Sequence, residues 1–242
     1  MPTPSPSRPA PPDPALDFPS LRGRFVVFDG PDGSGKSTQL RRFIDAATAQ
    51  GLTICEVREP GGTELGERIR SLLLDPAHSH DMTDRCQMLL YMASRAQLVE
   101  EKIRPALQRG ELVLADRFIS STFAYQGTAG GIPIDAIEAV GRVTLDDCWP
   151  DLVVIFDVDE RTATARMNPL LRESEFDHEK DRMEMRGQAF HRRVRQGYLD
   201  QANKEPDTHL VIDATAAPDR VYDALLAGLQ AHAAHWPNTP AS

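Results

Sequence analysis

The chain has 242 residues, of which 40% are hydrophobic and 26% are charged, and its formal net charge is −9 at pH 7. This apolar content is enough for a substantial core, and we expect one domain flanked by tails. The acidic balance argues against general binding to nucleic acid or to anionic membranes, because both attract basic surfaces. No stretch of sequence approaches the ~18 uninterrupted apolar residues of a membrane-spanning helix.

The cysteines indicate the cellular compartment, and the first twenty residues indicate where the folded domain begins. Cys55, Cys86 and Cys148 are odd in number and form no C-x-x-C pair, so neither a disulfide framework nor a zinc site is indicated. Reduced thiols are typical of a cytoplasmic protein. The first twenty residues hold eight of the nineteen prolines and no apolar signal core. We therefore predict a disordered tail over 1–20, a single domain over 21–236 and a short tail over 237–242.

Alternating apolar runs and helical patterns fill the predicted domain. Helices are indicated where apolar residues recur three or four positions apart, and strands where short apolar runs stop at polar or glycine-rich segments. In chain order we expect a strand at 25–28, a helix at 36–50, a strand at 53–57, helices at 64–74 and 83–109, a strand at 112–115, a helix at 133–145, strands at 151–157 and 210–212, and a helix at 218–233.

This order of elements predicts an α/β fold. Five short strands that are apolar on both faces, separated by helices, are typical of a parallel sheet covered on both sides. Because a glycine-rich loop that ends in Lys36 and Ser37 follows the first strand, we expect a three-layer sandwich of the P-loop NTPase type, with a five-stranded parallel sheet. Ligands of such sheets gather beyond the carboxyl ends of the strands, where the segments 58–63 and 116–118 follow two of the predicted strands.

A phosphate-binding loop connects the first strand to the first helix. Gly30, Gly35, Lys36 and Ser37 match the G-x-x-x-x-G-K-[ST] pattern in this context. Glycines let backbone N–H groups approach phosphate oxygens, and the helix start adds free donors. The pattern places Lys36 at the β- and γ-phosphates and Ser37 on Mg²⁺. The predicted ATP-binding residues are Gly30, Pro31, Asp32, Gly33, Ser34, Gly35, Lys36, Ser37 and Thr38.

Three motifs occur in the same order as in a known enzyme family. The segments FDGPDGSGKST at 28–38, REPGGT at 58–63 and DRFISSTFAYQG at 116–127 resemble those of thymidylate kinases, which are P-loop nucleoside monophosphate kinases. The resemblance extends over about residues 24–235. It implies transfer of the ATP γ-phosphate to dTMP, giving dTDP for dTTP synthesis, with Mg²⁺ and in a homodimer. A phosphomonoester with its second pKa near ~6 is already ionised, so no general base is required.

The resemblance also implies roles for residues on the acceptor side. A carboxylate among phosphate-binding N–H groups would repel phosphate, so Asp32 is expected to face the acceptor, where the family uses an acidic residue to bind the 3′-hydroxyl. Glu59 and Pro60 are expected beside dTMP, and Arg70 is similar to an arginine that holds the acceptor phosphate. Alternatively, Asp32 lies in a surface turn, the REPGG segment only connects a strand to a helix, and Arg70 lies on a solvated helix face.

A second group of residues is expected around the base and the transferred phosphate. Tyr91 and Arg95 lie four apart on one helix face, suited to stack on a pyrimidine and to donate to its carbonyl; the alternative is packing with a cation–π contact between them. By resemblance Asp116 acts on Mg²⁺ and Arg117 bridges the donor and acceptor phosphates. The polar residues expected at the thymine edge and the sugar are Ser121, Thr122, Tyr125 and Gln126.

Residues 161–186 resemble the mobile lid of the family, whose arginines close over the ATP phosphates. Arg166, Arg172 and Arg182 are the candidates in this chain. A helix with surface ion pairs is the competing interpretation of these charges.

Two other functions use a similar loop. A deoxynucleoside kinase phosphorylates a neutral hydroxyl and needs a general base, for which Glu59 is a candidate. A P-loop GTPase switch would need the guanine-reading N-K-x-D motif, but Asn203 and Lys204 continue as Glu205 and Pro206.

Overall fold

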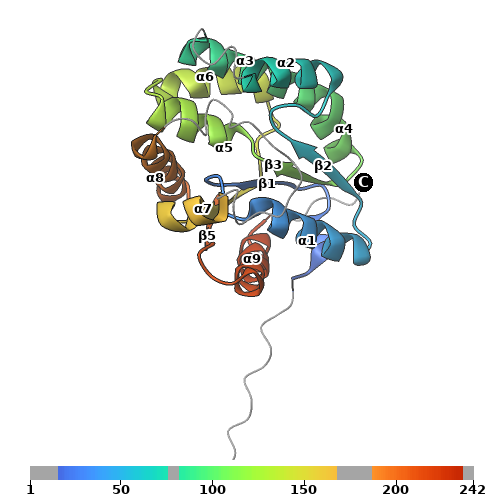
Figure 1. Cartoon of the computed structure of the whole chain (residues 1–242). Helices are drawn as coiled ribbons and strands as arrows, with labels where there is room; N and C mark the ends of the chain where they lie inside the picture. The colour runs from blue at the N-terminus through green and yellow to red at the C-terminus, as the bar shows by residue number, and fades with distance from the viewer. Residues whose placement is uncertain (1–15, 76–81, 168–186, 237–242) are drawn as a thin grey trace, which may run out of the picture.

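The computed structural model describes residues 16–75, 82–167 and 187–236, and all structural statements below concern these ranges. A parallel sheet in the order β2-β3-β1-β4-β5 forms its centre (Figure 1). The strands are β1 (Phe25–Asp29), β2 (Ile54–Arg58), β3 (Leu112–Asp116), β4 (Leu152–Asp157) and β5 (His209–Asp213). The predicted five-stranded parallel sheet is confirmed, with strand bounds within two residues of the prediction.

The two edge strands differ from the prediction that all strands are buried on both faces. Every residue of β1 is buried, as expected for a central strand. In β2 and β5 only the fourth residue is buried, and Glu56 and Val211 are exposed. The prediction was wrong for these two strands, because each lies at an edge of the sheet with a neighbour on only one side.

Helices cover both faces of the sheet and build two separate cores. Phe25 and Val27 pack on the face covered by α3 (Asp84–Leu98), α4 (Arg104–Gln108) and α8 (Gln188–Lys204). Val26 and Phe28 alternate with them and pack on the face covered by α1 (Lys36–Ala49) and α9 (Pro218–Ala233), which lies below the sheet in Figure 1. Further helices are α2 (Glu64–Leu74), α6 (Ile134–Leu145) and α7 (Glu160–Met167).

Several helices depart from the sequence prediction. The helix expected at 83–109 contains the π-helical turn η3 (Val99–Ile103) between α3 and α4. The segment after β3, which carried no helical prediction, forms α5 (Ile119–Thr122) and the π-helical η4 (Phe123–Ala129). Its small and polar residues show little apolar periodicity, and packing against α8 and α3 stabilises the helical form.

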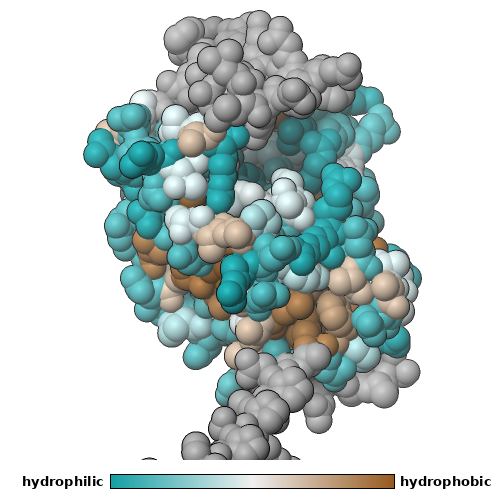
Figure 2. Space-filling view, turned by 60° about the horizontal axis from the view of Figure 1, so that its bottom comes forward, coloured by the Kyte–Doolittle hydropathy of each residue, from teal (hydrophilic) through white to brown (hydrophobic). Residues whose placement is uncertain are grey.

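The predicted tail over 1–20 was too long by at least five residues. Leu16 and Leu21 are buried, and Leu21 is the last residue of a 3₁₀ turn, η1 (Phe18–Leu21). The ring of Phe18 lies 5.7 Å from that of Phe43 on α1, so this segment closes the lower core. Apolar surface, coloured brown, alternates with hydrophilic side chains on this side of the molecule (Figure 2).

Within the described ranges, no helix combines the length and the apolar character needed to cross a membrane.

Candidate active site

The phosphate loop has the strained backbone that its glycines predict. Gly30, Gly33 and Gly35 have φ values of 131°, 75° and 87°. A Cβ atom at Gly30 would lie 2.6 Å from the carbonyl oxygen of Phe156, so the loop passes directly over β4. Gly35 precedes α1, and no side chain caps the first N–H groups of this helix. The Thr38 N–H donates to the Gly35 carbonyl oxygen, whereas the N–H groups of Lys36 and Ser37 at the start of the helix are positioned to bind an anion.

Lys36 reaches back across this loop. Its Nζ donates to the carbonyl oxygens of Gly30 and Pro31, each at 3.0 Å, and the residue is buried. Burial and the nearby charge of Arg117 lower the pKa of Lys36 to about 8. The hydroxyl of Ser34 is also buried, and it has no hydrogen-bond partner among the described residues.

One predicted lid arginine lies against the loop. Arg166 on α7 donates from Nη1 to the carbonyl oxygen of Ser34 at 3.3 Å. The same nitrogen would lie 3.9 Å from a Cβ at Gly35. Arg172 and Arg182 lie outside the described residues.

Ser37 and Asp116 meet at the entrance to the loop. The Ser37 hydroxyl donates to Oδ2 of Asp116 at 3.4 Å. Hydroxyl and carboxylate oxygens are the ligands that Mg²⁺ prefers, and Mg²⁺ usually takes only one or two protein ligands beside phosphates and waters. The pair therefore fits the predicted magnesium site in chemistry and place.

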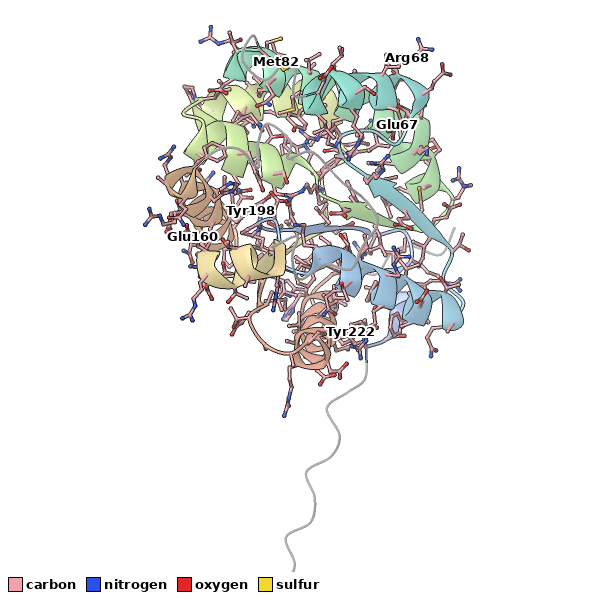
Figure 3. The ribbon with its side chains drawn as sticks, viewed as in Figure 1. Glu67, Arg68, Met82, Glu160, Tyr198 and Tyr222 are labelled. Carbon is pink, nitrogen blue, oxygen red and sulfur yellow. The ribbon has the colours of Figure 1, made fainter. Side chains whose placement is uncertain are left out.

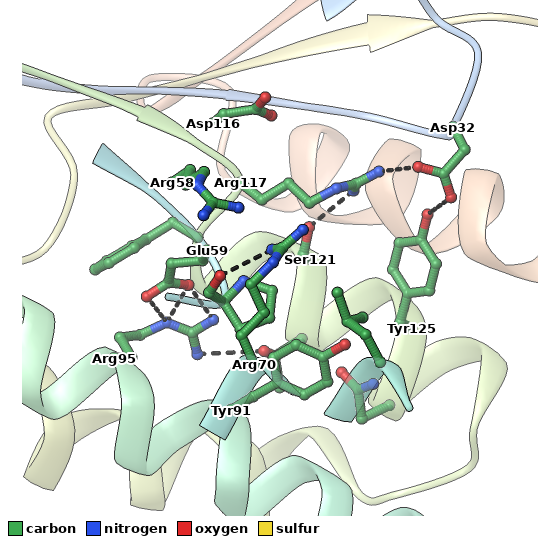
Figure 4. A pocket seen from close by; sticks show the side chains of 15 residues that line it. Asp32, Arg58, Glu59, Arg70, Tyr91, Arg95, Asp116, Arg117, Ser121 and Tyr125 are labelled. Carbon is green, nitrogen blue, oxygen red and sulfur yellow. Dashed lines mark hydrogen bonds and ion pairs between the residues drawn. The ribbon is translucent and has the colours of Figure 1, made fainter. Parts of the chain in front are cut away.

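A pocket beside the loop collects the predicted acceptor residues. It is lined by all ten of them: Asp32, Glu59, Pro60, Arg70, Tyr91, Arg95, Ser121, Thr122, Tyr125 and Gln126. Arg58, Leu74, Asp116, Arg117 and Phe118 complete the lining. Figure 4 shows the Glu59–Arg95 pair at one end and the Arg117–Asp32 pair at the other, with Arg58 and Arg70 between them.

Glu59 and Arg95 form a buried ion pair at the base of this pocket. Arg95 Nε donates to both carboxylate oxygens at 3.0 and 2.8 Å, and Nη2 donates to Oε2 at 2.5 Å. The two side chains are 3% and 1% exposed. Burial raises the pKa of Glu59 to about 7, against the opposing charge of Arg95. Arg95 Nη1 also reaches the Thr122 hydroxyl at 3.2 Å, and its guanidinium lies over the ring of Phe118.

Asp32 joins the pocket to the phosphate loop. One carboxylate oxygen accepts from Arg117 Nη2, and the other accepts from the Tyr125 hydroxyl at 2.9 Å. Burial would raise the pKa of Asp32, but the charges of Arg117 and Lys36 outweigh it and lower the pKa to about 2. Asp32 is thus an ionised carboxylate in the turn of the loop, and it faces the pocket with its side chain 27% exposed.

Two arginines lie between the ends of the pocket. Arg70 Nη1 donates to the Pro60 carbonyl at 2.9 Å. Arg58 Nη2 donates to both carboxylate oxygens of Glu67 at 3.1 Å, and this pair is half exposed. Arg58 was not among the predicted site residues, although it opens the REPGGT motif that pointed to the site.

Sequence reasoning also missed three buried polar residues. Asp29 ends β1 and Tyr198 lies on α8, and both contact Arg117 or its neighbours. Gln87 on α3 is buried and accepts from the side-chain amide of Gln126 at 3.3 Å. An acidic residue ending an apolar strand was a signal for Asp29, whereas Tyr198 and Gln87 carried none.

Comparison with known proteins points to one family. A family model described as thymidylate kinase matches residues 28–225. A thymidylate kinase of Exiguobacterium sp. is 42% identical over 206 residues, covering 85% of this chain and 93% of the relative. One from Deinococcus radiodurans is 42% identical over 204 residues, covering 83% and 93%.

Solved structures agree. The crystal structure of thymidylate kinase from Ehrlichia chaffeensis superposes with a TM-score of 0.67 at 30% identity and covers 86% of this chain and 98% of that one. With this fold, these motifs and these relatives, the chain belongs to the thymidylate kinase family of nucleoside monophosphate kinases.

Proposed function

We propose that the chain transfers the γ-phosphoryl group of ATP to dTMP, giving dTDP for dTTP synthesis. The observation that carries this proposal is the contact between Arg117 and Asp32, because it places a cation and a carboxylate where the phosphate loop meets the acceptor pocket. Family membership supports the same reaction.

On the acceptor side, Arg95 and Tyr91 are proposed to bind the thymine ring, with Thr122 and Gln126 at its polar edge. Thr122 is already bonded to Arg95, so the polar edge and the guanidinium form one surface. Asp32 accepts from the sugar 3′-hydroxyl, and Tyr125 and Ser121 limit the space beside the sugar. Glu59 orients Arg95, and Arg70, fixed to Pro60, holds the acceptor phosphate together with Arg58.

On the donor side, the loop from Gly30 to Thr38 is proposed to bind the ATP phosphates. Lys36 would exchange its two carbonyl partners for phosphate oxygens, and Arg166 lies within reach of the same loop. Ser37 and Asp116 would hold Mg²⁺, which would supply positive charge to neutralise the ATP phosphates. Arg117 then neutralises charge on the transferred group from the acceptor side.

The ionisation of the site favours a phosphate acceptor over a nucleoside. A neutral hydroxyl needs a general base with a pKa near the working pH. Asp32, with its pKa lowered to about 2, is a poor base. Glu59 has a pKa of about 7, which would suit a base, but both of its carboxylate oxygens accept hydrogen bonds from Arg95. An acceptor phosphate needs positioning and charge neutralisation only, which these arginines supply.

Initial rates of ADP release with different acceptors test this proposal. We expect dTMP to support turnover at least about 100-fold faster than thymidine, since no general base is available for a nucleoside hydroxyl. Faster turnover with thymidine would favour a deoxynucleoside kinase. Tight GTP binding with hydrolysis that no acceptor stimulates would favour a GTPase switch.

We also propose a cytoplasmic homodimer. Large apolar side chains are exposed on three helices that pack side by side: Leu65 and Leu72 on α2, Leu89 on α3, and Ile134 and Val143 on α6. Val143 is 87% exposed, and a second copy of the chain would bury it. Light scattering coupled to gel filtration should give a dimer mass, and Val143→Glu with Leu72→Glu should give a monomer.

A further inference from the structure

A buried carboxylate lies behind Arg117, on the side away from the pocket. Asp29, at the end of β1, is fully buried. It accepts hydrogen bonds from the Gly30 N–H at 2.9 Å, from Arg117 Nη1 at 3.2 Å, and from the hydroxyls of Ser120, Ser121 and Tyr198 at 2.6 to 3.0 Å. Burying a carboxylate costs free energy, and the several hydrogen-bond donors around Asp29 compensate for that cost.

Arg117 itself sits in a backbone conformation that side chains rarely adopt. Its φ is 68°, one of two positive values among the described residues other than glycine. Such a conformation is unfavourable for a side chain and persists only where its surroundings fix it. The Arg117 N–H donates to the carbonyl oxygen of Phe28 at 3.0 Å, which ties this backbone to β1 next to Asp29.

The two ends of the Arg117 guanidinium have different partners. Nη1 donates to Asp29, to the carbonyl oxygen of Gly30, and to the hydroxyls of Ser121 and Tyr198, all at 3.1 to 3.2 Å. Nη2 donates to Asp32, which lines the acceptor pocket. One end is therefore held by the protein interior, and the other faces the place of reaction.

Tyr198 brings a third element into this arrangement. It lies on α8, is fully buried, and donates its hydroxyl hydrogen to Asp29 at 2.6 Å while accepting from Arg117. A Cβ at the preceding Gly197 would lie 2.8 Å from the Thr128 side chain, so α8 approaches η4 closely at this point. Arg195 fixes the same turn to β4 through Asp157, with two bonds of 2.6 and 2.7 Å.

We propose that Asp29 and Tyr198 are positioning residues that hold the Nη1 end of Arg117, so that Nη2 stays directed at the acceptor phosphate. The inference rests on the proposed function, since it assigns Arg117 to the transferred group. Arginine side chains lose much rotamer freedom when they are fixed. Asp29 and Tyr198 fix this one before substrate binds, which lowers the barrier to the chemical step rather than the affinity for ATP.

The test uses hydroxyl and charge removal with matched controls. Tyr198→Phe removes one oxygen from this cluster, whereas Tyr222→Phe removes one from a buried tyrosine between α9 and α1, whose hydroxyl reaches the Arg42 carbonyl (Figure 3). Asp29→Asn neutralises the carboxylate in the cluster. As its control, Asp151→Asn neutralises a carboxylate that accepts from Arg24 and from the Phe25 N–H at the opposite end of β1.

We expect Tyr198→Phe to lower kcat about 3- to 10-fold and Asp29→Asn about 10- to 100-fold, with KM for ATP within twofold of the parent value. The two controls should keep the parent kcat. Guanidinium NMR of the full chain, with Arg117 assigned by Arg117→Lys, should give separate Nη signals in the parent protein and averaged signals in both cluster variants.

Different outcomes test the proposed function and the positioning role of Asp29 and Tyr198. A parent enzyme without dTMP-dependent ADP release overturns the proposed function, while the NMR comparison still decides whether Asp29 and Tyr198 hold Arg117. A parent enzyme that is active, with kcat and Nη signals unchanged in Tyr198→Phe, overturns the inference. If Asp29→Asn fails to fold, Tyr198→Phe decides alone.

Discussion

The two halves of the site hold their charges in different ways. On the acceptor side, side chains pair with one another: Glu59 with Arg95 and Asp32 with Arg117. On the donor side, Lys36 and Arg166 donate to backbone carbonyls of the loop itself. A carbonyl is a weaker partner for a cation than a carboxylate is, so these contacts give way to phosphate at little cost.

Because of this difference, we expect the two substrates to be bound in different ways. The acceptor pocket is built before dTMP arrives, because Arg95 and Arg117 are oriented by the carboxylates of Glu59 and Asp32. The phosphate loop is complete in its backbone, but its cations stay ready to change partners. Variants on the acceptor side should therefore affect stability and dTMP binding, and variants on the donor side should affect turnover with little effect on stability.

The largest effect is expected from breaking the buried acceptor pair. Glu59→Gln leaves the Arg95 charge buried without its counter-ion, and we expect a loss of about 1–3 kcal/mol in the free energy of unfolding, because the burial that raises the pKa of Glu59 offsets part of the attraction within the pair. Urea denaturation at pH 8 and fixed protomer concentration measures it, because the Glu59 pKa of about 7 leaves the carboxyl mostly ionised there.

The control for Glu59 is Glu67→Gln. Glu67 pairs with Arg58 at the surface, where the two side chains are 44% and 51% exposed. We expect a change below about 1 kcal/mol for this variant. Equal losses in the two variants would contradict the contrast between buried and exposed pairs.

A smaller effect in free energy, but a large one in rate, is expected on the donor side. Lys36→Met keeps the length of the side chain and removes its charge, so we expect kcat to fall about 10²- to 10³-fold. The free energy of unfolding should not fall, because burial outweighs the attraction of the nearby carboxylates and lowers the pKa of Lys36, so the charge does not stabilise the folded state. Steady-state kinetics beside urea denaturation checks both, with the exposed Lys102→Met as control.

Asp32 tests whether the loop is divided between the substrates. Asp32→Asn removes the charged acceptor of the Tyr125 and Arg117 contacts, and we expect KM for dTMP to rise about tenfold. KM for ATP should change less than about twofold, since the carboxylate faces away from the donor phosphates. Equal increases in the two constants would make Asp32 a general structural residue of the loop.

The smallest expected effect is on the number of protons taken up when ATP binds. Because the pKa of Lys36 is lowered to about 8, the free protein holds only part of this proton at pH 8. Phosphate charge raises the pKa again, so ATP binding at pH 8 should take up about half a proton more than at pH 6.5. Calorimetry in buffers of different ionisation enthalpy measures the uptake. The same difference in Lys36→Met would show that another group titrates.

Much of this architecture was predictable from local sequence. The strands, most helices and the phosphate loop follow from apolar periodicity and from glycines at positions that need positive φ. All ten predicted acceptor residues line one pocket, because the motifs that carry them end neighbouring parallel strands or lie on the helices beside them.

The remainder depends on contacts between distant parts of the chain. Tyr198 and Asp29 are 169 positions apart, and nothing near Tyr198 distinguishes it from a core aromatic residue. The helical turns at 119–129 form against α8 and α3, so their own residues do not announce them. The edge strands were misread because strand order is not encoded within a strand.

The buried segment at 16–21 has a practical consequence for protein production. Leu16 and Phe18 cover the core beneath α1, so the compositional boundary of the proline-rich stretch is not the edge of the folded unit. A shortened chain for crystallisation should begin before Leu16. Trimming to residue 21 would expose Phe43 and invite aggregation through the uncovered apolar surface.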